Sequence, residues 1–244
     1  MPALPDEPER VRIPEASPRK LPEPAQDRPL AEARDVIRRI LSTDGTIHGD
    51  EDDPDFVPRQ LAGIADAAER EGFLFRDLIP DAKGGVEHDL TFDSATGTVL
   101  KFTKPDRSAY AVDFELGTPR MGRATPLDYL DRLALQNEIF ADTLRFVGIA
   151  SNTNGKRIVT RQNTVKGRPA RWEETVILME DLGFTKMRHN HGIGYEDSYA
   201  FFRDDYAVFD MRPANVFVTE EGDVVPVDCI PVKLPAGKHE FFAK

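Results

Sequence analysis

Three polar residues in the last quarter of the sequence have the types and the spacing that phosphoryl transfer requires. Asn215 follows Asp210 by five residues, and Asp228 lies thirteen residues further on. Phosphoryl transfer needs a carboxylate that orients the acceptor hydroxyl. It also needs an amide oxygen and a second carboxylate that hold Mg²⁺ against the nucleotide phosphates. We therefore expect Asp210 to orient an acceptor, and Asn215 and Asp228 to bind the metal.

The residues around this triplet predict a hairpin. Val216-Phe217-Val218 and Val224-Val225 flank Glu221-Gly222-Asp223, a turn sequence between two apolar runs. One loop and this hairpin would bring the three side chains together. Asp and Asn are also common in turns, so an ordinary surface hairpin with acidic ends remains an alternative from the spacing alone.

A second candidate region carries a lysine and a pair of glycines. From about residue 73 the pattern predicts three short strands, at residues 78–79, 86–92 and 98–102, with Gly84-Gly85 between the first two. Glycine backbone could approach phosphate closely, and Lys101 in the third strand could reach phosphate oxygens. A hairpin turn and an edge-strand lysine that opposes aggregation are the alternatives for this segment taken alone.

A helix predicted at residues 126–147 supplies a possible partner for Lys101. Glu138 lies between Ala134 and Ala141 on the expected apolar stripe, and a buried carboxylate must find a partner or lose its charge. We expect a Lys101–Glu138 ion pair, although Asn137 could equally mark the edge of the stripe.

The segment that joins these two regions decides where a nucleotide-binding hinge would lie. Asn154-Gly155 predicts a hairpin between residues 146–150 and 157–161. Residues 176–179 could form a strand before the hinge, or residues 169–182 could form a helix with acidic residues in its first turn. We favour the helix, which places the hinge at residues 162–167 and makes Gln162 a candidate nucleotide contact.

Composition limits the class of protein. The chain has 244 residues, a net charge of −11 and a single cysteine, Cys229. The acidic charge argues against nucleic acid as a partner, and one cysteine allows no internal disulfide. No apolar segment has the length of a membrane span, so we expect a cytoplasmic protein with no membrane partner.

The N-terminal part reads as an arm followed by helices. The first 29 residues hold eight of the nineteen prolines among charged residues, which predicts a flexible arm. Residues 30–41 and 61–68 have apolar residues at helical spacing, and Gly72 should end the second helix. The acidic loop at residues 50–55 separates them. We expect the two helices to brace the region that follows.

Taken together, these segments resemble a known family. The sequence stretches that carry the resemblance are Gly84-Gly85-Val86-Glu87-His88, Gly97-Thr98-Val99-Leu100-Lys101, Ile158-Val159-Thr160-Arg161-Gln162, Lys166-Gly167-Arg168-Pro169-Ala170, Gly183-Phe184, Asp210 to Asn215 and Pro226-Val227-Asp228. They are similar to the kinase domains of polyvalent proteins of phages and conjugative elements, over roughly residues 73–235. The resemblance implies an α+β, two-lobed protein-kinase-like fold and an ATP-dependent serine/threonine kinase activity.

The resemblance also implies a role for each candidate residue. Asp210 would be the catalytic base, Lys101 would bind the ATP phosphates, and Glu138 would orient Lys101. Asn215 and Asp228 would bind Mg²⁺. The remaining contacts are Arg212, which would balance charge on the transferred phosphoryl group, and Gly84, Gly85 and Gln162, which would contact the nucleotide.

Some features depart from the family pattern. Val208 stands two residues before Asp210, where larger kinases have His or Tyr, so we expect apolar packing to hold the backbone there. Asp228 is followed by Cys229 and Ile230 without a glycine, and only sixteen residues follow Asp228 in this sequence. We therefore expect a reduced C-terminal lobe, and an acceptor that is a small molecule, a docked protein or the chain itself.

These observations divide the chain and leave two alternatives open. The expected parts are an arm at 1–29, a helical extension at 30–72, an N-lobe at 73–162 and a compact C-lobe at 163–244. A pseudokinase-type binding module of a mobile element is one alternative to an active kinase. A small-molecule kinase of the aminoglycoside-phosphotransferase type is the other, because it shares the Asp–Asn–Asp spacing.

Overall fold

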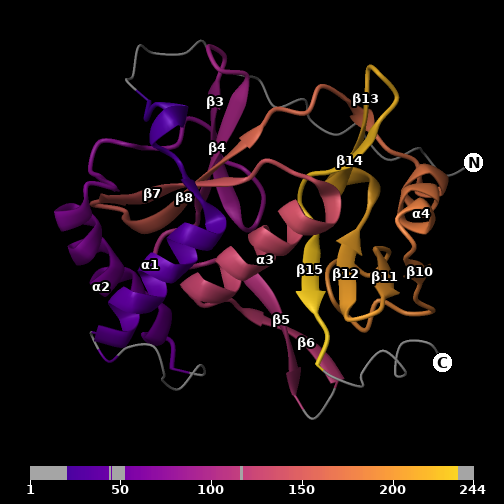
Figure 1. Ribbon diagram of the computed structural model, residues 1–244, viewed down its shortest axis with the longest axis horizontal. Coiled ribbons are helices and arrows are strands. Elements are labelled where there is room, and N and C mark those ends of the chain that lie inside the picture. The colour runs from indigo at the N-terminus through magenta and orange to yellow at the C-terminus, as the bar shows by residue number, and fades with distance from the viewer. Residues whose placement is uncertain (1–20, 44, 46–52, 116–117, 236–244) are drawn as a thin grey trace, which may run out of the picture.

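The computed structural model describes residues 21–43, 45, 53–115 and 118–235. In these residues the chain is a mixed α and β protein with four α-helices and mostly antiparallel sheets. Figure 1 shows a large sheet with α1 and α2 at one end, smaller sheets with α4 at the other, and α3 between them. The α+β class expected from the sequence is thus confirmed. Most of the expected arm, at residues 1–20, and residues 50–52 of the acidic loop lie outside the described residues.

The large sheet contains six strands, which come from residues 28–163. Its order is β1-β7-β8-β4-β3, with β2 added to β7 in parallel. The bounds are β1 Arg28–Pro29, β2 Leu74–Phe75, β3 His88–Asp93, β4 Thr98–Thr103, β7 Arg145–Asn152 and β8 Gly155–Asn163. The expected hairpin of β7 and β8 is confirmed, since Asn152 pairs with Gly155 across its turn.

The predicted strand at residues 78–79 is not present. The strand lies earlier, at β2, and Leu78 instead packs in the core against Leu100 and Phe102. Pro80 lacks a backbone donor, which disfavours strand pairing directly after Leu78.

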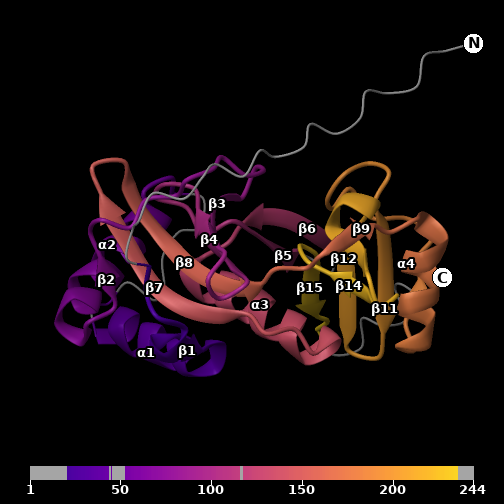
Figure 2. The same ribbon diagram turned by 90° about the horizontal axis from the view of Figure 1, so that it is seen from above.

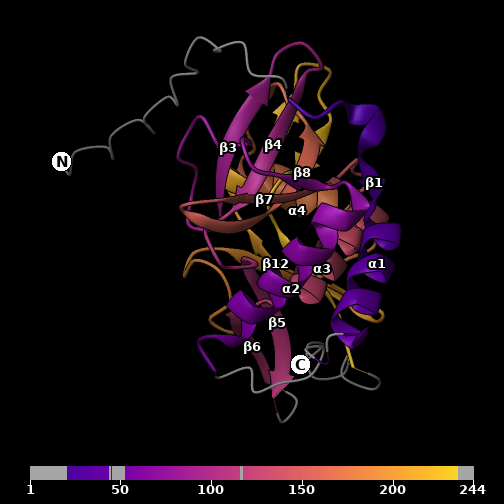
Figure 3. The same cartoon turned by 90° about the vertical axis from the view of Figure 1, so that its left-hand side faces the viewer.

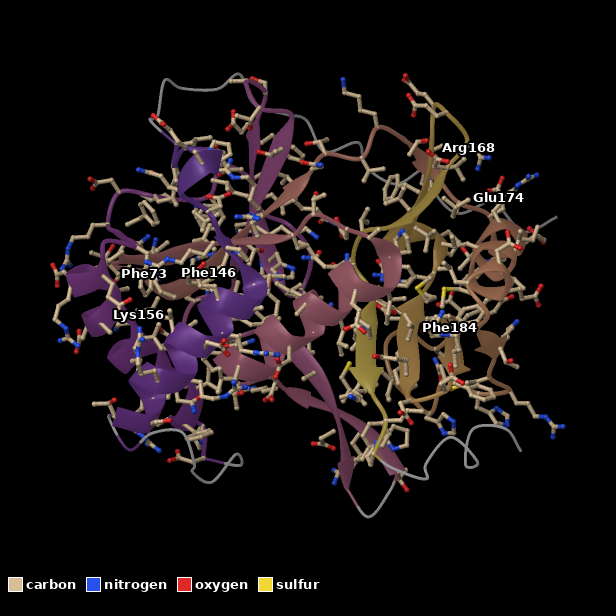
Figure 4. The ribbon with its side chains drawn as sticks, viewed as in Figure 1. Phe73, Phe146, Lys156, Arg168, Glu174 and Phe184 are labelled. Atoms are coloured by element: carbon tan, nitrogen blue, oxygen red, sulfur yellow. The ribbon has the colours of Figure 1, made fainter. Side chains whose placement is uncertain are left out.

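The two N-terminal helices form as expected and pack on the large sheet. They are α1, Leu30–Thr43, and α2, Phe56–Glu71, and Gly72 ends α2 with a left-handed φ of 77°. Figure 3 shows both helices beside β7. Phe73, directly after α2, meets Phe146 of β7 edge to face with ring centroids 5.8 Å apart (Figure 4).

Residues 21–29, which we expected to belong to the flexible arm, are packed against the sheet. They contain the 3-10 helix η1, Pro24–Gln26, and strand β1, which pairs with β7. The buried Arg161 of β8 donates to the Pro22 carbonyl oxygen and to the Asp27 carboxylate. The expectation of an arm is therefore wrong for this stretch, because the composition gave no sign of a buried arginine that binds it.

The helix expected at residues 126–147 is shorter. It is α3, Pro126–Phe140, with Thr125 and Asp128 forming a capping box, and it ends at Ala141 with φ 52°. The Asn137 side chain bonds both the amide and the carbonyl of Leu144, at 3.0 and 2.9 Å. These bonds turn the chain out of the helix and into β7.

Three small sheets and one helix complete the fold; the β5–β6 sheet precedes α3 in the sequence, and the other two sheets and the helix follow β8. Helix α4, Trp172–Asp181, confirms the helical interpretation of this segment, and Figure 2 shows it on the outer side of the small sheets. The sheet orders are β10-β11-β12-β15, β14-β13-β9 and β5-β6. The bounds are β5 Tyr110–Glu115, β6 Thr118–Arg123, β9 Gly167–Pro169, β10 Thr185–Lys186, β11 Tyr199–Arg203, β12 Tyr206–Met211, β13 Val216–Thr219, β14 Val224–Pro226 and β15 Ile230–Lys233.

One exposed ion pair ties α4 to strand β9. Arg168 donates two hydrogen bonds to Glu174, at 2.7 and 2.9 Å, and the pair is visible at the start of α4 in Figure 4. The bidentate geometry fixes the helix start beside the segment that leaves β8.

Strand pairing brings the ends of the Asp210–Asp228 segment together. β15 runs antiparallel to β12, with Phe209 opposite Ile230. The predicted hairpin is confirmed as β13 and β14, and the Val227 amide donates to the Asn215 carbonyl at 2.8 Å. The residues on either side of the hairpin therefore lie next to one another.

Candidate active site

Asp210 lies near the end of β12, not in a loop, and its carboxylate is held by two hydrogen bonds. Its φ of 56° is uncommon for a residue with a side chain. Oδ1 accepts from the Tyr195 amide at 3.2 Å, and Oδ2 accepts from Asn215 Nδ2 at 2.9 Å. Val208 is fully buried in an apolar cluster, as expected. The loop at Tyr195 is a second support, which the sequence did not indicate.

Gly194 allows that loop to close on Asp210. Its φ is 78°, and a Cβ there would lie 2.4 Å from Asp210 Oδ1. Only a residue without a side chain fits at this distance without a shift. The loop is tied in turn by Asn190, whose Nδ2 donates to the Tyr195 carbonyl at 2.8 Å.

Charge around Asp210 suits proton acceptance. Burial raises its pKa, and the nearby Asp228 adds to the increase, while the Tyr195 amide, Arg212 and Asn215 act in the opposite direction. Arg212 Nε lies 3.7 Å from Asp210 Oδ1, and its guanidinium stacks on the Tyr195 ring at 3.8 Å. A carboxylate with a raised pKa is a better base near neutral pH.

Asn215 and Asp228 present oxygen atoms at the other side of the same site. Asn215, at the end of η2, Pro213–Asn215, uses its amide NH₂ to bind the Asp210 backbone and side chain. Its side-chain oxygen, Oδ1, makes no hydrogen bond with any described residue. The Asp228 side chain is 41% exposed, although Arg132 Nη2 lies 3.3 Å from its Oδ1. Both residues can therefore offer an oxygen to a hard cation.

Three cationic or basic groups surround Asp228. Partial burial raises the pKa of its carboxyl, but Lys101, His88 and Arg132 together outweigh this effect and hold the pKa below its usual value. Lys101 extends from β4, and its Nζ donates to the Val227 carbonyl at 2.8 Å. Lys101 thus lies next to the candidate metal ligand Asp228.

Some of these groups line one cavity of about 290 Å³, and Asp210 and Arg132 are hydrogen-bonded to residues that line it. Lys101, Asn215 and Asp228 lie on its wall, so the structure brings together the three positions on which the sequence interpretation depends. The apolar side chains that line it come from β3, β4, β13 and the segment after β8, and they are Leu90, Phe92, Val99, Val165 and Phe217. The cavity has an apolar part and a charged part, as a nucleotide site requires.

Gln162 and the two glycines have separate environments. Gln162 lies at the cavity wall, but its side chain donates to Asp142 at 2.6 Å. Gly85 lines the cavity, and a Cβ there would meet nothing within 4 Å. At Gly84 a Cβ would lie 2.4 Å from the His88 carbonyl oxygen. Gly84 is therefore needed for local backbone packing, whereas Gly85 is the glycine that faces the cavity.

The expected Lys101–Glu138 ion pair is wrong. Glu138 accepts a hydrogen bond from the Tyr206 hydroxyl at 2.8 Å, and Lys101 binds Val227 instead. The buried face of α3 carries Tyr129, Leu133 and Gln136, so the stripe predicted from the sequence was rotated around the helix. The shorter helix also removes Ala141 and Leu144 from that stripe.

Arg132 is the charged residue that α3 sends into the site. Its guanidinium contacts Glu87 at 2.7 and 3.1 Å as well as Asp228. Glu87, His88 and Asp228 have ligand atoms within 4.8 Å of one another. None of Arg132, Glu87 and His88 was among our predicted site residues. A signal existed for Arg132, which lies three residues after Tyr129 and four before Gln136 on one helical face.

Three other cavities are larger. One of about 460 Å³ lies between α3 and the β5–β6 hairpin and has Arg132 in its wall, one of about 520 Å³ lies beside the start of α2, and one of about 530 Å³ lies between residues 21–26 and 74–78. None of the three is lined by Lys101, Asp210, Asn215 or Asp228. No helix in the described residues combines the length and apolar composition needed to cross a membrane.

Comparison with known proteins adds the family. Residues 119–234 match the model of a family described as Serine/Threonine/Tyrosine Kinase found in polyvalent proteins. No curated protein and no solved structure matches the chain significantly. The match includes Asp210, Asn215 and Asp228, whereas Lys101 and the glycines precede it. The resemblance indicated by the sequence is therefore confirmed over residues 119–234, which are similar to the kinase family found in polyvalent proteins.

Proposed function

We propose that this protein is an ATP- and Mg²⁺-dependent phosphotransferase of protein-kinase-like type that phosphorylates a Ser/Thr-type hydroxyl. The observation that carries the proposal is that Lys101, Asn215 and Asp228 face one cavity from different elements. Asp210 is hydrogen-bonded to Asn215 at the edge of that cavity. The kinase family match over residues 119–234 supports the same reaction class.

Each part of the cavity has a role in the proposed reaction. The adenine base packs against Leu90, Val99 and Phe217, and backbone groups near Val165 line its edge. Lys101 binds the phosphates as a cation. Asp210 accepts the proton of the acceptor hydroxyl and holds it in line for attack.

The residues present fit a magnesium ion. The side-chain oxygen of Asn215 accepts no hydrogen bond from a described residue, and the Asp228 carboxylate is partly exposed. Both are the hard oxygen ligands that Mg²⁺ prefers. When bound, the ion would neutralise phosphate charge during transfer. The hydrogen bonds from Asn215 to Asp210 fix the position of the proposed metal ligand relative to the proposed base.

We also propose that the fold is two-lobed, with a reduced C-terminal lobe. The large sheet with α3 and the β5–β6 sheet is the N-lobe, the other two small sheets with α4 are the C-lobe, and residues 162–167 are the hinge. Helices α1 and α2 brace the N-lobe through β7. The acceptor is a protein or a small molecule that reaches Asp210 from the Tyr195 side.

The test measures Mg²⁺-dependent loss of labelled γ-phosphate from ATP. The phosphate is followed to the chain itself, to added Ser- and Thr-containing peptides, and to water. We expect Asp210→Asn to lose transfer but keep nucleotide binding, and Lys101→Met to weaken both. Lys156→Met is the matched control, because Lys156 lies at the β7–β8 hairpin, away from the cavity (Figure 4).

The outcomes separate the candidate functions. Equal behaviour of wild type, Asp210→Asn and Lys101→Met would refute the proposal. Thermal stabilisation by nucleotide without any transfer would favour a pseudokinase-type binding module instead.

A further inference from the structure

Arg132 is a buried cation on α3 that holds two residues of the cavity wall, Glu87 and Asp228. Its side chain is 3% exposed, and it bonds two carboxylates, Glu87 and Asp228. Its Nε and Nη1 also donate to the carbonyls of Cys229 and Tyr110, at 3.1 and 2.9 Å. Four acceptor groups therefore hold this arginine, which leaves it little freedom to move.

Glu87 acts as the anchor of this arginine. Its two oxygens accept from Nη1 and Nη2, and Oε1 also accepts from the Tyr110 amide at 3.0 Å. Burial alone would lower the pKa of Arg132, but Glu87 and Asp228 outweigh burial and raise it. Arg132 therefore remains charged at every pH at which the protein is folded.

The edge of the guanidinium formed by Nε and Nη2 faces Asp228 and Cys229. Nη2 lies 3.3 Å from Asp228 Oδ1, and Nε binds the carbonyl of the next residue, Cys229. One arginine thus fixes both the side chain and the backbone at this position. Groups that hydrogen-bond a metal ligand set its orientation and its basicity.

We propose that Arg132 is a positioning residue that fixes the Asp228 carboxylate for the metal ion and ties the loop at Glu87 to it. The inference rests on the proposed function of the cavity. The sequence led us to expect that α3 would place an acidic residue, Glu138, against Lys101. We propose instead that α3 places a basic residue, Arg132, against the metal ligand Asp228. Movement of α3 would then change metal binding directly.

The test compares metal affinity in variants with Mn²⁺ as the probe for Mg²⁺. Mn²⁺ binding is followed by electron paramagnetic resonance in the presence of a non-hydrolysable ATP analogue. The main variant is the double substitution Arg132→Met with Glu87→Gln. It removes the arginine without leaving a buried carboxylate unpaired, so it is the form that should stay folded. We expect a loss of roughly 10- to 100-fold in Mn²⁺ affinity.

Two further variants and one readout distinguish positioning from a general structural role. Arg132→Lys keeps a cation but cannot bind all these acceptors, so its Mn²⁺ affinity should fall between wild type and the double variant. Arg34→Met is the matched control. Arg34 of α1 pairs at 2.8 Å with Asp131, which lies on α3 next to Arg132 but outside the cavity. Analogue binding without metal should be equal in all four proteins.

Each outcome decides the proposal. Wild-type Mn²⁺ affinity in the double variant would overturn it, and so would tighter binding, which would show that Arg132 competes with the metal. Absence of Mn²⁺ binding in the wild type with its nucleotide analogue would overturn the proposed function itself, and this role with it.

Discussion

Replacement of Gly194 by alanine should disable Asp210 without closing the nucleotide cavity. A Cβ at this position would lie 2.4 Å from Asp210 Oδ1 and 2.7 Å from both its Cβ and Cγ. An ordinary contact begins at 3.4 Å, so the carboxylate has to move by about 1 Å or the loop has to open. Either movement breaks the hydrogen bond from the Tyr195 amide.

The size of the effect follows from this displacement. Misplacement of a reacting group by about 1 Å costs on the order of 100-fold in rate, or about 3 kcal/mol in activation free energy. The left-handed backbone adds a separate cost of about 1–2 kcal/mol to the free energy of unfolding. We therefore expect Gly194→Ala to lose about 100-fold in phosphoryl transfer and to be moderately less stable.

Gly192→Ala separates the two contributions. Gly192 has nearly the same φ, 73°, in the same loop, but a Cβ there would meet nothing within 4 Å. It should therefore show the loss of stability alone. The assay measures single-turnover release of labelled γ-phosphate, with nucleotide affinity and urea unfolding measured for both variants. Equal transfer rates in the two alanine variants would refute the argument that Gly194 positions Asp210.

Three other predictions test the surroundings of the cavity. Gly84→Ala should lower the free energy of unfolding by roughly 1–3 kcal/mol, because its Cβ would lie 2.4 Å from a backbone oxygen. Gly85→Ala, whose Cβ would meet nothing within 4 Å, should leave the free energy unchanged. A larger loss for Gly85→Ala than for Gly84→Ala in thermal unfolding would contradict the structural role given to Gly84. Arg161→Met should cost about 3–5 kcal/mol in urea unfolding because it leaves the Asp27 carboxylate buried without its cation, and the double variant with Asp27→Asn should recover much of that loss if the reasoning holds. Burial lowers the pKa of His88 to about 4 from its ordinary 6.5, so the unfolded chain takes up the proton first as the pH falls. In metal-free buffer the free energy of unfolding should thus decrease by up to about 3 kcal/mol between pH 6.5 and 4, and His88→Gln should flatten this part of the curve; parallel curves would exclude the effect.

The features that follow local patterns were predictable from the sequence. The helices at residues 30–41 and 169–182 and the hairpins at 154–155 and 221–223 have apolar periodicity and turn residues that specify them without reference to distant contacts. The convergence of Asp210, Asn215 and Asp228 was also predictable from local sequence, because one strand, one 3-10 turn and one hairpin, which follow one another along the chain, bring the three together.

The features that depend on distant partners were not predictable in this way. The register of α3 is set by what its faces meet, and Tyr129 was not counted as apolar although it is fully buried. Because Tyr129 was left out, the buried face was predicted on the wrong side of the helix, and Glu138 was expected to point inward where Arg132 does. Gly194 gave no local signal either, because its partner is Asp210, sixteen residues along the chain.

The charges around the cavity suggest why metal and nucleotide should bind together. Cationic and anionic side chains are equal in number there, and they are Lys101, Arg132 and Arg212 against Glu87, Asp210 and Asp228. His88 adds no charge at neutral pH because its pKa is about 4. A free divalent cation would add two positive charges to a balanced site, and free ATP would add several negative ones. The complex of the two changes the balance least, so each ligand should increase the affinity for the other.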